Sequence, residues 1–203
     1  MISSTLGYDY SASTFRVFTN LKVDIVFITD TYETELVKRC LDLSSDAQRE
    51  LYDRYKDAMY TLLYRLIGNE EDAADALQEA FIQVFKGLKN FRYRSTLGAW
   101  IKTIVVRAGI SQLNKSIPIH DHAYMTLNNT CTEDENLLGY YLEQAIHQLP
   151  KKCRAVFILV EVEGYAHHEV ADIMDISIGT SKSQLSYAKK LLQKSLMELK
   201  YDL

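Results

Sequence analysis

Residues 163–192, with the sequence EGYAHHEVADIMDISIGTSKSQLSYAKKLL, decide the fold of the second half of the chain. Two short helical patterns are joined here by a turn around residues 175–177, and the second pattern is basic. Ala171 is a small residue at the point where the first helix must approach the second. Ile176 and Leu185 can fill the core between them. This arrangement predicts a helix-turn-helix.

The second of these helices carries polar groups of the kinds that reach phosphates and base edges in the major groove. Ser177 can cap its first turn. The candidate DNA-binding residues are Ser177, Thr180, Ser181, Lys182, Ser183, Gln184, Ser186, Tyr187, Lys189 and Lys190. From spacing alone, a helical hairpin that never touches DNA remains an alternative.

Helical periodicity extends outward from this motif over most of the chain. Apolar residues recur at spacings of three and four over residues 32–116 and again over residues 137–200. Residues 117–136 break the pattern with a proline, paired asparagines and an acidic end, which predicts a linker. We therefore expect an all-α fold of two small helical domains joined by a flexible linker, the second a winged-helix-like domain without a wing.

The first 31 residues differ in character from the rest, being rich in Ser, Thr, Tyr and Phe. The run Val23–Ile28, VDIVFI, resembles a strand, but no second run offers a hairpin partner. We expect an N-terminal extension that is a disordered tail, a lineage-specific addition, or translated upstream sequence from a start codon placed too early.

Composition excludes several classes of protein. The chain has 203 residues, of which 47% are hydrophobic, with only two prolines and eight glycines. No apolar run predicts a transmembrane helix, and no secretory signal is visible, so we expect a cytoplasmic protein without membrane insertion. Three widely spaced cysteines predict neither a disulfide framework nor a zinc site. No phosphate-binding glycine loop or nucleophile–base motif occurs, so we expect no enzyme activity, no cofactor and no metal.

Charge is segregated along the chain, although its formal net value is only −4. Residues 91–115 hold five basic residues and no acid, whereas residues 69–80 hold five acids and no base. Residues 180–200 are again strongly basic. Such a chain is suited to an anionic partner on one face and a cationic partner on another.

These motifs resemble a known family. EGYAHHEVADIMDISIGTSKSQL is similar to the promoter-reading region 4 of sigma-70-type factors, and GTSKSQL is similar to a variant found in extracytoplasmic-function (ECF) sigma factors of the Bacteroidota. LVKRCLDLSSDAQRELYDRYKDAMY and NEEDAADALQEAFIQVFKGLKNFRYRSTLGAWIKTIVV resemble region 2. The resemblance implies a sigma factor, with region 2 in residues 32–116 and region 4 in residues 137–200.

The resemblance also implies partners and residue roles. In DALQEAF, the residues expected to bind the β′ coiled coil of core RNA polymerase are Asp75, Gln78, Glu79 and Phe81. The residues expected to open and read the −10 element are Phe91, Arg92, Tyr93, Arg94, Ser95, Thr96, Trp100, Lys102 and Arg107. Region 4 is expected to dock on the β flap and read the −35 element. An anti-sigma factor is a further expected partner.

Some residues admit two interpretations. Phe91 and Trp100 are core anchors or base-stacking platforms, and the paired histidines His167 and His168 are solvated or face phosphates. Arg107, Tyr187 and Lys189 depart from residues that the family often carries, so the preferred promoter sequence stays open. The alternative function is a stand-alone helix-turn-helix regulator, which binds DNA as a dimer and has no need of DALQEAF or of the aromatic–basic loop.

Overall fold

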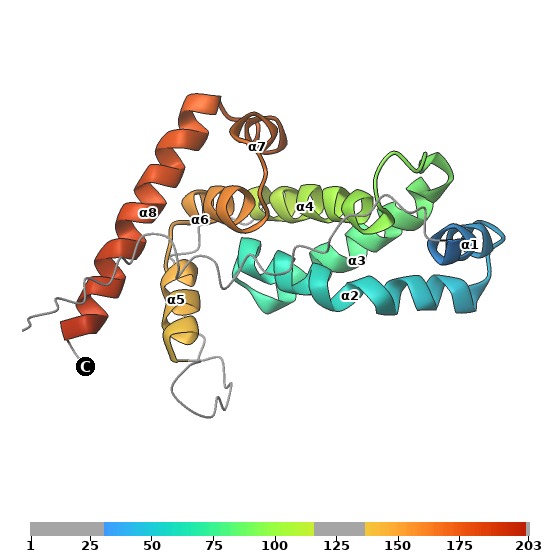
Figure 1. Cartoon of the computed structure of the whole chain (residues 1–203), viewed down its shortest axis with the longest axis horizontal. Coiled ribbons are helices and arrows are strands. Elements are labelled where there is room, and N and C mark those ends of the chain that lie inside the picture. Colours follow the sequence, from blue (N-terminus) through green and yellow to red (C-terminus); the bar gives the residue numbers. More distant parts are fainter. Residues whose placement is uncertain (1–30, 116–136, 202–203) are drawn as a thin grey trace, which may run out of the picture.

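The computed structural model describes residues 31–115 and 137–201, and its first helical unit begins close to the predicted boundary. Figure 1 shows the arrangement. The elements of this unit are α1 (Thr31–Leu41), α2 (Ser45–Ile67), α3 (Glu70–Gly87), the 3₁₀ helix η2 (Leu88–Asn90) and α4 (Leu97–Lys115).

Short polar side chains define where these helices begin. Ser44 caps α2 by accepting a hydrogen bond from the backbone N–H of Ala47, and Asn69 caps α3 by accepting one from that of Asp72 at 2.9 Å. Both caps satisfy backbone donors that an α-helix leaves unpaired at its start. Thr96 caps α4, since its Oγ1 accepts a hydrogen bond from the backbone N–H of Ala99 at 3.2 Å.

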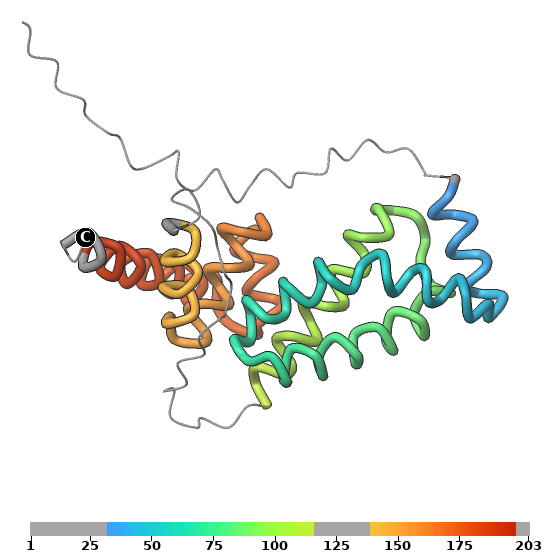
Figure 2. The backbone as a smooth tube through the Cα atoms, turned by 90° about the horizontal axis from the view of Figure 1, so that it is seen from below, coloured from blue at the N-terminus to red at the C-terminus, as the bar shows by residue number. Residues whose placement is uncertain are grey.

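Helices α2, α3 and α4 lie side by side and bury their apolar stripes against one another (Figures 1 and 2). Leu63, Ala80 and Val105 are completely buried between them. Gly109 allows α4 to approach α2, because a Cβ atom at this position would lie 2.8 Å from the Leu63 side chain. Because the inner faces of α3 and α4 are packed in this core, their opposite faces are exposed to solvent.

The second unit contains the predicted helix-turn-helix. Its elements are α5 (Leu137–His147), α6 (Lys151–Phe157), the π-helix η3 (Ile158–Val162), α7 (His167–Met174) and α8 (Ile178–Tyr201). The long helix α8 packs against α5, α6 and α7. Asp175 makes the turn between α7 and α8 with a left-handed φ of 53°, a conformation that Asp tolerates better than most residues.

The described residues are helical in both units and contain no strand, which confirms the predicted all-α, two-domain fold. Within residues 31–115 and 137–201, no helix has the length and hydropathy needed to cross a membrane. The predicted N-terminal extension up to residue 30 and the predicted linker lie outside the described residues.

The two units pack against each other, and one apolar core runs through both. Helix α2 contacts α6, and α4 contacts α7. At this boundary the ring of His147 in α5 lies 4.8 Å from that of Tyr64 in α2, measured between centroids. Nothing in the sequence pattern indicated this contact, because helical periodicity reports which face is apolar but not which partner covers it.

His147 makes the stability of this boundary dependent on pH. Burial and, next in size, the nearby Arg154 guanidinium lower the pKa of His147 below its ordinary value of 6.5. Arg65 lowers the pKa slightly further, whereas Glu143 opposes these effects. The ring faces Tyr64, and its buried Nε2 has no hydrogen-bond partner among the described residues. The fold therefore favours the neutral ring.

We expect His147 to contribute full stability above about pH 6.5 and to destabilise the fold as the pH falls through that value, because protonation is easier in the unfolded chain. The loss is smaller than it would be for a fully buried group, since the ring is only partly buried. Urea unfolding of wild type and His147→Gln between about pH 7.5 and about pH 5 measures it. His168→Gln, at an exposed position in α7, is the control, and an identical pH dependence in all three proteins would contradict the prediction.

Candidate protein- and DNA-binding surfaces

The solvent face of α3 carries the predicted polymerase-binding residues, with one exception. Asp75, Gln78 and Glu79 are exposed and share one face, as spacings of three and four on a helix require. Phe81 lies on the opposite face, is only 3% exposed, and packs edge-on against Tyr52 at 4.8 Å. The structure therefore corrects the role predicted for Phe81, which supports α3 from within the core and presents no surface to a partner.

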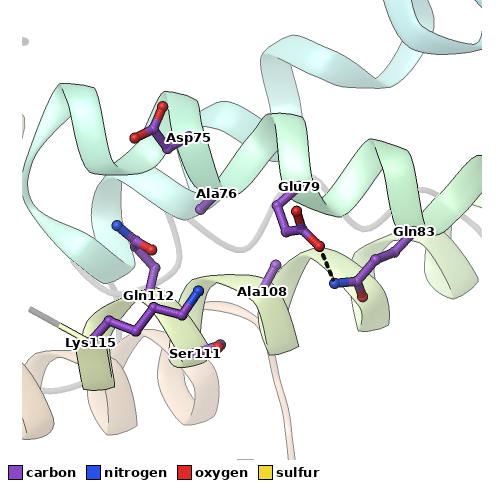
Figure 3. Close-up of a pocket in the computed structure, with 8 residues that line it drawn as sticks. All are labelled: Asp75, Ala76, Glu79, Gln83, Ala108, Ser111, Gln112 and Lys115. Carbon is purple, nitrogen blue, oxygen red and sulfur yellow. Dashed lines mark hydrogen bonds between the residues drawn. The ribbon is translucent and has the colours of Figure 1, made fainter.

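A hollow lies beside these acids, between α3 and the end of α4 (Figure 3). Its lining residues are Asp75, Ala76, Glu79, Gln83, Ala108, Ser111, Gln112 and Lys115. Glu79 accepts a hydrogen bond from the Gln83 amide at 3.0 Å, and Gln112 donates one to Asp72 at 2.9 Å. The carboxylates of Asp75 and Glu79 thus line an open, mainly polar surface, where they can accept bonds from cationic side chains.

Ile82 belongs to the same exposed face and was missed by the sequence reasoning. Its side chain is 47% exposed, although it is a large apolar residue in the middle of a helix. It follows Gln78 by four positions and Glu79 by three, which places the three side chains together. The sequence signal that could have identified Ile82 as exposed is its position outside the apolar stripe of α3.

The loop before α4 gathers three aromatic rings. The Phe91 ring lies 4.7 Å from that of Tyr93 and 5.3 Å from that of Trp100, measured between centroids. Phe91 and Trp100 are partly buried, whereas Tyr93 is 41% exposed and has a left-handed φ of 54°. The partly buried rings of Phe91 and Trp100 thus form a platform that supports Tyr93 at the surface.

Cationic and hydroxyl groups surround Tyr93. Arg92, Arg94 and Ser95 are exposed in the same loop, next to the partly buried cap residue Thr96. An exposed aromatic ring flanked by arginines can stack on an unpaired base while the arginines contact phosphates. The structure therefore brings together the loop residues that were predicted to act on the −10 element.

Two predicted −10 residues lie further along α4. Arg107 is exposed. Lys102 is engaged within the protein, because its Nζ lies 3.0 Å from a carboxylate oxygen of Glu163 and 5.8 Å from the ring centre of Tyr165. Both of those partners belong to the segment between η3 and α7, in the second unit.

Helix α8 presents most of the predicted −35 residues to solvent. Ser177 caps it, as predicted, by accepting a hydrogen bond from the backbone N–H of Thr180 at 2.9 Å. The candidate contact residues that are exposed are Ser177, Lys182, Ser183, Ser186, Tyr187, Lys189 and Lys190. Short hydroxyls, lysines and a tyrosine on one long helix provide both phosphate contacts and groups for base edges.

Three of the predicted −35 residues in α8 are engaged by side chains of other elements of the unit. Ser181 is fully buried and its Oγ lies 2.9 Å from Nδ1 of His167, so it joins α7 to α8 and does not face DNA. The amide oxygen of Gln184 accepts a bond from the thiol of Cys153 at 2.6 Å. Lys189 pairs with Glu161 at 2.9 Å. The structure therefore corrects the DNA contact predicted for Ser181, which instead positions α7 against α8.

Comparison with known proteins matches both units in the expected order. The family model for sigma-70 region 2 matches residues 51–116, and that for sigma-70 region 4 matches residues 140–192. Together they cover more than half of the chain. The region 2 match contains the α3 face and the loop before α4, and the region 4 match contains the exposed residues of α8.

Similar whole proteins are also known. The chain is 26% identical over 179 residues to the ECF RNA polymerase sigma factor SigW of Bacillus subtilis, covering 80% of this chain and 96% of that protein. It is 27% identical over 180 residues to the ECF RNA polymerase sigma-E factor of Haemophilus influenzae, covering 81% and 95%.

Solved structures share the fold. CnrH, solved in complex with the cytosolic domain of CnrY, superposes with a TM-score of 0.50 at 17% identity, covering 80% of this chain and 96% of that one. The sigma factor RpoE of Bartonella quintana, solved with the anti-sigma factor NepR, gives a TM-score of 0.50 at 23% identity, covering 73% and 96%. With both family regions present in order, the chain belongs to the sigma-70 family as an ECF sigma factor, a non-enzymatic initiation factor that directs RNA polymerase to promoters through regions 2 and 4.

Proposed function

We propose that residues 32–116 act as region 2, binding core polymerase through the α3 face and opening the −10 element with the loop before α4. Residues 137–200 act as region 4, docking on the β flap and reading the −35 element with α8. The observation that carries this division is the pairing, on one small unit, of an exposed acidic face (Asp75, Glu79) with an exposed aromatic–basic loop (Arg92, Tyr93, Arg94). A stand-alone regulator needs neither surface.

The residues proposed to act are those that the structure leaves accessible. On α3 they are Asp75, Gln78, Glu79 and the additional residue Ile82. Tyr93 and its neighbouring arginines are proposed to hold an unstacked base and its phosphates, supported by Phe91 and Trp100 from beneath. On α8 the exposed lysines and hydroxyls are proposed to contact the major groove.

Run-off transcription tests this function directly. Purified core polymerase, the full-length chain and a pool of genomic promoter fragments should give products that depend on the chain. A gel-shift assay with the same pool should show promoter binding only when core is present. Tight binding by the chain alone, as a dimer on palindromic sites, would instead support a stand-alone regulator.

An anti-sigma factor and a cytoplasmic location form part of the same proposal. The related folds of CnrH and RpoE were solved with CnrY and with the anti-sigma factor NepR, respectively, which supports an inhibitory partner here. Cys40 and Cys153 are free and buried, as suits a reducing compartment. The similarity to Bacteroidota sequences stays a prediction, because the relatives reported above do not test it.

A further inference from the structure

A large apolar side chain lies at the start of the helix proposed to read the −35 element. Ile178 is the first residue of α8, its side chain is 47% exposed, and it does not belong to the apolar core. The sequence reasoning did not assign it to DNA. Single exposed apolar residues are common on protein surfaces, so the surroundings of Ile178 decide whether it has a function.

The hydroxyl groups next to Ile178 are engaged within the helix. Oγ of Ser177 accepts a hydrogen bond from the backbone N–H of Thr180 at 2.9 Å, and it lies 2.9 Å from Oγ1 of the same residue. The hydroxyl of Ser183 donates to the backbone carbonyl of Thr180 at 3.0 Å. Each of these predicted contact residues therefore has an internal partner, which a base edge would have to replace or share.

Helical spacing places Ile178 in a row with two exposed contact candidates. Lys182 and Ser186 follow it by four and eight positions in α8, and both side chains are exposed. Figure 1 shows this end of α8 beside α7 and away from α5. Ile178 thus extends the exposed face of α8 to the end of the helix that lies at the turn of the helix-turn-helix.

This position also suits a contact with bases. When a helix-turn-helix binds DNA, the first residues of its second helix are the ones that contact base edges in the major groove. An isoleucine side chain neither donates nor accepts hydrogen bonds, and it carries no charge to attract a phosphate. At this position it can recognise DNA only through an apolar contact.

The major groove offers one apolar group for such a contact. Thymine presents a C5 methyl group there, whereas the other three bases present hydrogen-bond donors and acceptors. A base pair without this methyl group would place a polar edge or water against the isoleucine. The chemistry of Ile178 therefore fits an A·T pair whose thymine methyl group faces it.

We propose that Ile178 is a specificity-determining residue of region 4, which packs against the C5 methyl group of a thymine in the −35 element. This inference deepens the proposed function and rests on it, since it uses α8 as the helix that enters the major groove. Uracil is thymine without this methyl group. The burial of one methyl group should therefore give a preference for thymine over uracil of about three- to five-fold.

Deoxyuridine tests the methyl contact without changing the base pairing. A promoter fragment that yields run-off product is prepared twice, with thymine or with uracil at every A·T pair of its −35 element. Competition gel shifts with core polymerase and the full-length chain, at one salt concentration, compare the two affinities. We expect wild type to bind the uracil promoter about three- to five-fold more weakly, and Ile178→Ala to bind both promoters equally.

Replacement of one thymine at a time then locates the contact. A single side chain reaches one or two neighbouring methyl groups, so we expect the whole loss at one or two positions of the −35 element. A loss spread evenly over all the thymines would indicate a change in DNA shape and would overturn the proposed contact.

A matched variant distinguishes this contact from the general loss of an apolar residue. Met197→Ala removes another large apolar side chain from α8, which is 55% exposed and lies near the opposite end of the helix. Met197→Ala should keep the full preference for thymine. Ile178→Ala should fold normally, because about half of its side chain is already exposed. A thymine preference that survives in Ile178→Ala, or disappears in Met197→Ala as well, contradicts the role given to Ile178.

A contact of Ile178 with polymerase is the other possible outcome. Fluorescence anisotropy of the labelled chain titrated with core polymerase, in the absence of DNA, should give the same affinity for wild type and Ile178→Ala. If the variant binds core more weakly and discriminates between thymine and uracil as wild type does, the residue contacts polymerase and the proposal is overturned.

Failure of this inference is distinguishable from failure of the proposed function. If wild type gives promoter-dependent product but binds thymine and uracil promoters equally, the methyl contact is overturned and the function stands. A −35 element without any A·T pair has the same consequence. If no promoter in the pool yields product, the promoter role fails, and the contact that rests on it fails with it.

Discussion

Reversing the two charges of the α3 face, with Asp75→Lys and Glu79→Lys together, should abolish most binding to core polymerase. Each exposed carboxylate can accept a charge-assisted bond worth about 1.5–3 kcal/mol, and a lysine in its place adds repulsion toward a cationic partner. We expect the dissociation constant to rise by at least about 100-fold. Fluorescence anisotropy of the labelled chain titrated with core polymerase measures this.

The control makes the same change in net charge elsewhere on region 2. Glu35→Lys with Asp57→Lys replaces two acids that are exposed on α1 and α2 rather than on α3. This variant should bind core within about two-fold of wild type, since exposed charges at a distance are screened by salt. Comparable losses in both double variants would show a general charge effect and contradict a specific α3 contact.

Two neighbouring apolar residues separate binding from folding in the same assay. Ile82→Ala should weaken core binding by about five-fold with little change in thermal stability, because its side chain is 47% exposed. Phe81→Ala should cost about 3–5 kcal/mol of folding free energy, because its ring is almost fully buried. A stable Phe81→Ala variant with a specific binding defect would contradict the packing role of Phe81.

The second large effect concerns promoter opening. The double variant Tyr93→Ala/Arg94→Ala removes the exposed ring and a neighbouring guanidinium from the loop before α4. Stacking on an aromatic side chain is worth about 1–3 kcal/mol per base, and a phosphate contact adds to it. We expect roughly 100-fold less open complex on duplex promoter DNA, measured as permanganate-reactive thymines.

A template with a pre-melted −10 bubble distinguishes melting from binding. Because the bubble supplies the unstacked bases, Tyr93→Ala/Arg94→Ala should recover a large part of its activity there. Tyr187→Ala, which removes another exposed tyrosine, this one from α8, should weaken recruitment on duplex and bubble templates alike. If the bubble restores neither variant, or both equally, the loop has no special part in melting.

Much of the fold was accessible from local sequence. Ser44 and Asn69 cap their helices because short polar side chains at those positions satisfy the first backbone donors, an effect confined to a few residues. The turn at Asp175 and the cap at Ser177 follow the same logic. The surface residues of DALQEAF were predicted from helical spacing together with the family resemblance.

Other features depend on contacts between distant residues, and local patterns carry no information about them. Phe81 and Ser181 were included among the contact residues because they lie within the right motifs, yet both are buried in the core. Lys102 was assigned to DNA from its position in α4, while its actual neighbour, Glu163, lies 61 residues away.

The sequence by itself determined the all-helical fold, the division into two domains and the family, because periodicity, capping and motif order are written in short stretches of chain. Only the tertiary structure decided how the domains meet. Arg154 reads as one more basic residue in an amphipathic helix, and its partners are backbone carbonyls that every residue possesses. The helix ends that Arg154 caps depend on how one domain docks on the other. That docking is set by three-dimensional complementarity, which cannot be deduced from the spacing of residues.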